Sequence, residues 1–137
     1  MIYVFVALTV LFWGIAPIFD KAALKNGDPY LGIIIRGLAI GLSMLVVMLI
    51  GSKAKDISIL PAKTIAYFAV SGLFAGILGT LTFYKALQSG ATSQIVPLAA
   101  TYPLVTALLS VALLGETVTA ARIAGTVLIV GGIWLVK

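Results

Sequence analysis

Long apolar runs, separated by short polar breaks, make up most of this chain of 137 residues. A helix needs roughly 20 apolar residues to cross the hydrocarbon core of a bilayer. Five runs come close to this length, and their approximate bounds are 2–19, 30–50, 64–84, 93–114 and 119–136. A strand of a membrane barrel is much shorter, at about ten residues. We therefore predict an all-α fold, a polytopic membrane bundle of five transmembrane helices.

The breaks between the runs carry charges and turn-forming residues. The first run ends at Asp20-Lys21, and Asp28-Pro29 is a helix-start signal for the second run. The fifth run is the weakest, because its 18 residues include Arg122, whose side chain has to reach the interface. All connections are short, so we expect a single domain over residues 1–137.

The composition of the chain also indicates a protein of the lipid bilayer. The chain is 62% hydrophobic and 9% charged, with a mean hydropathy of +1.22, which is too apolar for the surface of a soluble domain. It contains no Cys and no His, so it lacks thiolates and the commonest general base and metal ligand. We expect no catalytic residue, no metal and no cofactor, and hence no enzyme. The nine Lys and Arg residues are scattered singly, which argues against nucleic acid as a partner.

Small residues line one face of several runs. Helices in a membrane associate by close backbone approach, and small residues three or four positions apart mark the contact. We expect these faces to pack inside the bundle, while contact with another subunit is an equally open role for the fifth run. The residues are Gly37 and Gly41 in the second run, Gly72, Gly76 and Gly79 in the third, and Ala121, Gly125 and Gly132 in the fifth.

Prolines lie inside two of the runs, at Pro17 in the first and at Pro97 and Pro103 in the fourth. Each removes a backbone hydrogen bond and is expected to kink its helix. The fourth run also carries hydroxyl groups such as those of Thr101 and Tyr102. Broken helices with polar groups at membrane depth indicate a transport pathway, although kinked packing helices share these features.

Ionisable residues within the runs are few. Arg36 lies about two turns into the second run and Lys85 closes the third. Each either reaches an interface, pairs with a carboxylate, or helps to hold an anionic substrate group. No carboxylate lies in the middle of a run, which disfavours proton antiport unless Asp20 or Glu116 is drawn inward.

The candidate substrate contacts add aromatic and hydroxyl groups to these two cations. Glu116 is assigned a structural role, because a carboxylate near a helix start can accept free backbone amides. The candidates for the substrate site are Trp13, Arg36, Tyr84, Lys85, Thr101 and Tyr102.

An ordered set of motifs in the second half of the chain resembles the EamA repeat of the drug/metabolite transporter superfamily. The set comprises Phe83-Tyr84-Lys85-Ala86-Leu87, Gly90-Ala91, Val96-Pro97, Tyr102-Pro103-Leu104-Val105, Leu114-Gly115-Glu116-Thr117-Val118-Thr119, Gly125 and Gly131-Gly132. The first half agrees more loosely, through Phe12-Trp13-Gly14, Asp28-Pro29 and Arg36.

The resemblance implies half of a transporter. Most members of the superfamily have ten helices in two repeats of inverted topology, with the substrate cavity between them, whereas this chain has one repeat. A branch with four helices per chain pairs two copies in antiparallel fashion and couples protons through a glutamate in the first helix. Trp13-Gly14 occupies the comparable region here, so drug/proton antiport is in doubt.

The distribution of positive charge favours such a pair independently. Lys and Arg residues near the ends of membrane spans set orientation, and here they are balanced. Four predicted on one side are Lys53, Lys55, Lys63 and Arg122, and four on the other are Lys21, Lys25, Lys85 and Lys137. A chain without bias can insert both ways.

We therefore expect a transporter of small metabolites or drug-like molecules, working by alternating access as an antiparallel homodimer in the cell membrane. The alternative is a non-transporting accessory subunit that pairs with another membrane protein, for example in lipid-linked sugar translocation. A self-sufficient dimer that moves solute would distinguish the two.

Overall fold

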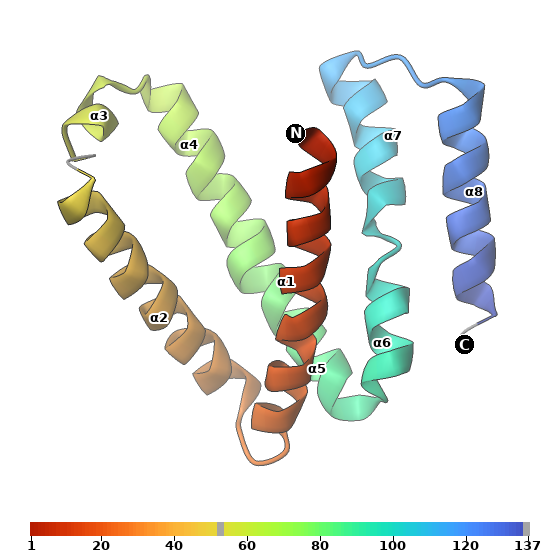
Figure 1. Cartoon of the computed structure of the whole chain (residues 1–137), viewed down its shortest axis with the longest axis horizontal. Helices are drawn as coiled ribbons and strands as arrows, with labels where there is room; N and C mark the ends of the chain where they lie inside the picture. The colour runs from red at the N-terminus through yellow and green to blue at the C-terminus, as the bar shows by residue number, and fades with distance from the viewer. Residues whose placement is uncertain (52–53, 136–137) are drawn as a thin grey trace. The chain divides into compact units, whose positions relative to one another are not determined.

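A computed structural model describes residues 1–51 and 54–135 (Figure 1), with helices throughout and no strand among these residues. The all-α membrane fold predicted from the apolar runs is confirmed. The helices are α1 (Ile2–Leu24), α2 (Pro29–Ile50), α3 (Ala54–Ile59), α4 (Ala62–Ser71), the π-helix η1 (Gly72–Gly79), α5 (Thr80–Ser89), α6 (Thr92–Ala99), α7 (Tyr102–Leu114) and α8 (Ala120–Trp134).

The described chain forms two compact units. The N-terminal unit contains residues 1–88, and the C-terminal unit runs from Ser89 to the end of the described chain. The expectation of a single domain over residues 1–137 stays a prediction.

Four helical stretches of the described chain are long and apolar enough to cross a membrane, at 2–24, 29–50, 62–89 and 92–114. The fifth predicted span corresponds to α8, which has only 15 residues. At 1.5 Å per residue, such a helix is roughly 22 Å long, shorter than a hydrocarbon core of about 30 Å. Residue 136 of that predicted span lies outside the described residues.

The connection between α1 and α2 differs from the prediction at one end and agrees at the other. The first helix continues past Phe19 to Leu24, and it runs unbroken across Pro17. The second starts at Pro29, where the Asp28 carboxylate accepts hydrogen bonds from the next two free amides, Tyr30 N at 2.8 Å and Leu31 N at 3.1 Å. This is the start that the Asp-Pro signal predicts.

A π-helix interrupts the third span, which the apolar pattern does not predict. In this geometry each N–H bonds to a carbonyl five residues back. The Thr80 hydroxyl also donates across five residues, to the Ala75 carbonyl at 3.0 Å. A Cβ added at Gly79 would lie 3.0 Å from the carbonyl oxygen of Phe74, so the widened turn is fitted to glycine there.

The fourth span is divided between α6 and α7, with a turn at residues 100–101. Pro97 lies inside α6 and Pro103 within the first two positions of α7. The Thr101 hydroxyl donates to the Leu98 carbonyl at 2.8 Å. The same carbonyl also accepts from the backbone N–H of Thr101 at 3.2 Å, so both the amide and the hydroxyl of Thr101 close the turn.

A left-handed glycine and a threonine cap join α7 to α8. Gly115 has φ = 67° and terminates α7. The Thr119 hydroxyl accepts from Arg122 N at 3.3 Å and so caps α8. The capping role expected of the Glu116 side chain is therefore taken by Thr119, which stands directly before the helix.

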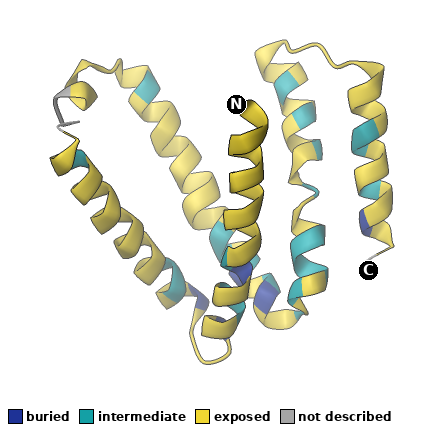
Figure 2. Ribbon diagram, in the orientation of Figure 1, coloured by how far each residue is buried: buried dark blue, intermediate teal, exposed yellow. Residues whose placement is uncertain are grey.

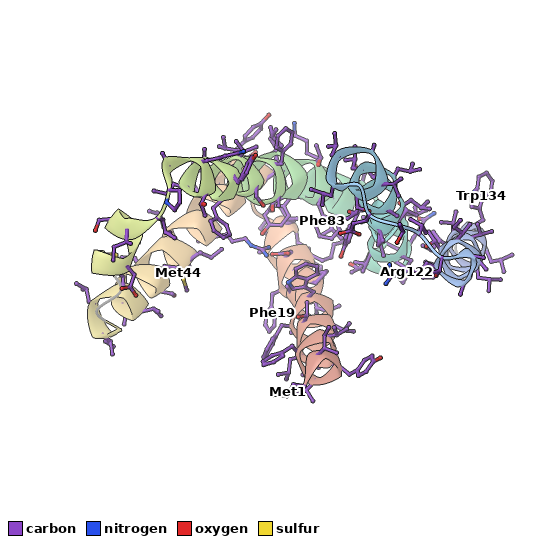
Figure 3. The ribbon with its side chains drawn as sticks, turned by 90° about the horizontal axis from the view of Figure 1, so that it is seen from above. Met1, Phe19, Met44, Phe83, Arg122 and Trp134 are labelled. Carbon is purple, nitrogen blue, oxygen red and sulfur yellow. The ribbon has the colours of Figure 1, made fainter. Side chains whose placement is uncertain are left out.

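Few side chains of the described residues are buried, and most of their surface is apolar and exposed (Figures 2 and 3). In the N-terminal unit the buried residues lie where α1, α2 and α5 meet, at Pro17, Leu24, Pro29, Tyr84 and Leu87. This surface is suited to lipid or to another helix-forming chain rather than to water.

The small-residue faces have no close neighbour within the described chain. A Cβ built at Gly37, Gly41, Gly72, Gly76, Gly125 or Gly132 meets nothing within 4 Å. Their predicted packing role stays a prediction.

Candidate polar site between three helices

Asp20, Arg36 and Tyr84 form a closed hydrogen-bonded cluster that joins α1, α2 and α5. Arg36 Nη1 lies 3.2 Å from Asp20 Oδ2 and 3.1 Å from Tyr84 Oη. The Tyr84 hydroxyl in turn donates to Asp20 Oδ1 at 2.8 Å. Each member thus bonds to the other two, and we call this set the three-helix cluster.

The cluster lies well inside the helices. Asp20 is four residues before the end of α1, Arg36 seven residues after the start of α2, and Tyr84 five residues before the end of α5. At 1.5 Å per residue, these positions are roughly 6–10 Å from the helix ends. The Asp20 side chain is 15% exposed, whereas that of Arg36 is 43% exposed. A carboxylate at this depth needs a charge partner, and Arg36 supplies it.

Gly32 lets the Tyr84 ring approach the backbone of α2. A Cβ added to Gly32 would lie 3.1 Å from Tyr84 Cε2 and 3.4 Å from Cδ2. Tyr84 is 4% exposed. One turn after Gly32 along the same helix stands Arg36, so the glycine places the phenol hydroxyl within reach of the guanidinium.

Further bonds hold the same ends of the three helices together. Lys85 Nζ donates to Tyr30 Oη at 3.1 Å and lies 4.9 Å from the centre of that ring. Lys21 Nζ donates to the Leu87 carbonyl. Gln88 Nε2 donates to the Gly27 carbonyl at 3.1 Å. The cluster is therefore held in a framework rather than by its own bonds alone.

The structure brings together three of the six predicted substrate contacts in the N-terminal unit. Arg36, Tyr84 and Lys85 lie at the common end of α1, α2 and α5. Trp13 stands seven residues before Asp20 on α1, two turns away on the same face, and is 64% exposed. Thr101 and Tyr102 belong to the C-terminal unit, with Thr101 in the turn between α6 and α7 and Tyr102 at the start of α7.

A second candidate surface, with polar side chains among apolar ones, lies within the C-terminal unit, between α7 and α8. It is an open groove whose lining includes Tyr102, Thr106, Ser110, Glu116, Arg122 and Thr126. The groove mixes hydroxyls with a carboxylate and a guanidinium, and no bond between Glu116 and Arg122 is formed in the described chain. All three hydroxyls of Thr106, Ser110 and Thr126 donate to carbonyls of their own helices.

Sequence reasoning missed Asp20 as a member of the site. Asp20-Lys21 has the form of a span end, but the helix continues because both side chains find acceptors or donors on neighbouring helices. No local pattern marks Asp20, because its role depends on Tyr84 and Arg36, which lie on other helices. Of the alternatives kept open for Arg36, pairing with a carboxylate is the one seen.

These features define an integral, multi-pass membrane protein of helical spans with polar groups gathered at depth. A family model described as the EamA-like transporter family matches residues 1–137. The chain therefore belongs to that family, as its motifs suggested.

Comparison with individual proteins adds a distant relative. An uncharacterized protein of Methanocaldococcus jannaschii is 31% identical over 130 residues, which cover 95% of this chain and 91% of the relative. No solved structure matches the chain.

Proposed function

We propose that the protein moves small molecules across the cell membrane by alternating access, and that two copies inserted in opposite orientations form the transporting unit. The observation that carries this proposal is the match of a transporter family model to the whole chain. One copy supplies about half the helices of the ten-helix arrangement implied by the resemblance, so a second copy is needed to complete it.

The exposed surface supports a partner of this kind. Glycine faces on α2, η1 and α8 have no neighbour within 4 Å in the described chain, and close approach between helices in lipid needs such faces. In an antiparallel pair each unit of one copy can meet its counterpart on the other copy. The small-residue faces are then interfaces between copies.

The transport pathway is proposed to lie at the polar groups of the spans. The three-helix cluster places a partly buried carboxylate and a guanidinium within the N-terminal unit. The interrupted fourth span places Thr101 and Tyr102 beside a turn. Discontinuous helices at membrane depth commonly build substrate sites in transporters. None of these groups requires a metal or a cofactor, and we propose transport rather than catalysis.

Proteoliposomes test the proposal directly. Purified protein is reconstituted without any other chain, and uptake of labelled amino acids, nucleosides and the cation ethidium is measured against empty liposomes. We expect at least one class to enter faster with the protein present. Uptake that never exceeds the empty control, together with copurification of a different membrane protein in fixed ratio, would replace the proposal with the accessory-subunit alternative.

A further inference from the structure

The Arg36 guanidinium uses only one of its nitrogens within the three-helix cluster. Both carboxylate contacts and the tyrosine contact involve Nη1, at 3.5, 3.2 and 3.1 Å. An arginine has five N–H donors in a planar fork, and the edge formed by Nε and Nη2 matches a carboxylate or phosphate in two parallel bonds. In the described chain that edge has no bonded acceptor, and the side chain is 43% exposed.

The other side of the guanidinium is fixed. Asp20 and Tyr84 hold Nη1 from two different helices, and the Tyr84 ring is wedged against Gly32. A guanidinium that is held on one side loses little freedom when a ligand binds the opposite edge. This is the arrangement of a preorganised anion receptor rather than of a simple ion pair, in which the carboxylate would occupy the fork itself.

Charge and shape around the cluster favour an anion with an apolar body. Lys85, adjacent to Tyr84 in the chain, brings a further cation to the same end of α1, α2 and α5. The Asp28 carboxylate is engaged by the first amides of α2. Trp13, on the face of α1 that carries Asp20, offers an exposed ring two turns away.

We propose that the open edge of Arg36 binds the anionic oxygens of a carboxylate or phosphate ligand, with Asp20 and Tyr84 as positioning residues. This deepens the proposed function by naming an anionic substrate class, and as a substrate site it rests on that function. The ligand oxygens come either from a transported solute or from an anionic lipid headgroup, and the experiment separates these sources.

Labelling with phenylglyoxal tests the site without any substitution. This reagent modifies arginine, and the chain has two arginines, Arg36 and Arg122, so mass spectrometry reads site and control in one sample. Protein in neutral detergent is labelled with benzoate, with the isosteric neutral benzamide, with the isosteric cation benzamidine, or with inorganic phosphate. We expect benzoate or phosphate to slow labelling of Arg36 by about tenfold, the equivalent of one charge-assisted hydrogen bond, and to leave Arg122 unchanged.

A lipid arm identifies the source of the anion. In phosphatidylcholine nanodiscs, protection by benzoate or phosphate indicates a soluble anion. Protection that appears on adding phosphatidylglycerol, with no further effect of benzoate, indicates a lipid headgroup. If none of these anions protects Arg36 more than Arg122, or if benzamide or benzamidine protects it equally, the proposal is overturned.

Substitution of the counter-ion gives an independent test. Asp20→Asn keeps an oxygen that can accept from Tyr84 and Arg36 but removes the negative charge that opposes an incoming anion. We expect half-maximal protection of Arg36 at a lower anion concentration in Asp20→Asn, and no change in the control Asp56→Asn, whose carboxylate lies on α3. Loss of anion protection in Asp20→Asn would contradict the proposed role of Asp20.

These measurements are made on binding alone. If anions protect Arg36 from labelling but the protein moves no solute in proteoliposomes, the anion site is supported and the proposed function is contradicted. Transport without protection has the opposite meaning, because a working transporter would then use a different substrate contact.

Discussion

Gly32 has no side chain, and this allows the ring of Tyr84 to lie close to the backbone of α2. Gly32→Ala would place a methyl group 3.1 Å from Tyr84 Cε2, and the ring has to move. Overpacking of this kind costs about 1–3 kcal/mol. We expect a lower thermal midpoint in detergent for Gly32→Ala and slower recovery after heating.

Gly37→Ala is the matched control for this prediction. It lies on the same helix, and its added methyl group meets nothing within 4 Å. Alanine favours helix over glycine by about 1 kcal/mol, so this variant is expected to be neutral or more stable. Equal destabilisation by both substitutions would show that contact with Tyr84 is not the cause.

Tyr84 makes a second prediction at the residue scale. Its hydroxyl donates to Asp20 at 2.8 Å and accepts from Arg36 at 3.1 Å. Tyr84→Phe removes both bonds and keeps the ring, and hydrogen bonds between membrane helices are worth about 0.6 kcal/mol on average. We expect a loss of about 1 kcal/mol in the free energy of unfolding, measured by denaturant titration in mixed micelles.

Tyr67→Phe supplies the comparison, because the Tyr67 side chain is 65% exposed on α4. It is expected to leave the free energy of unfolding unchanged. A similar loss in both variants would mean that the hydroxyl of Tyr84 has no special role in joining the helices.

At the scale of the element, two polar residues precede α8, and they have different roles. Thr119 caps the helix through Arg122 N, whereas the Glu116 carboxylate forms no hydrogen bond to the described chain. Removing a threonine cap costs about 0.5–2 kcal/mol. We expect faster hydrogen exchange at the first amides of α8 in Thr119→Ala.

Glu116→Gln is the control for that substitution. It changes charge and keeps shape, and exchange at the start of α8 should be as in the unaltered protein. Faster exchange in Glu116→Gln instead would return the capping role to Glu116, as the sequence alone indicated.

The sequence predicted element types better than it predicted their limits. Apolar length is a direct physical requirement of the bilayer, so the helices at 29–50 and 92–114 agree closely with the predicted runs. The end of α1 was missed because Asp20 and Lys21 are charged, and a charge ends a run unless a partner on another helix accepts it. Such partners cannot be read from local periodicity. The π-helix was missed for a similar reason, since its glycines fit an ordinary small-residue face equally well.

The candidate site was predicted in part. Arg36, Tyr84 and Lys85 were singled out because ionisable and aromatic groups within apolar spans are rare. Asp20 and Gly32 were not, because the role of each depends on the position of Tyr84, which lies 64 and 52 residues away in the chain. Long-range pairings of this kind are set by packing rather than by motif.

At the scale of the whole molecule, opposite insertion of two copies makes a prediction about charge. Lys55→Gln with Lys63→Gln removes two positive charges from one predicted side of the membrane, and Lys25→Gln with Lys137→Gln removes two from the other. Orientation follows the bias in Lys and Arg, so each double variant should insert in one direction only. A reporter fused to the C-terminus should be active on opposite faces in the two variants and on both faces in the unaltered protein.

Co-expression completes this test. Either double variant alone should lack transport, and the two together should restore it, because only together do they supply both orientations. Full transport by one double variant alone would exclude the antiparallel pair.

The division of the chain into two units has a spectroscopic consequence. Each unit contains one of the two tryptophans of the chain, Trp13 on α1 and Trp134 on α8. Trp13→Phe and Trp134→Phe would each leave a single emitter, so the fluorescence spectrum and its quenching by brominated lipids would report on one half of the protein at a time. The two native tryptophans can therefore report the depth of each unit in the bilayer, without an added dye or cysteine.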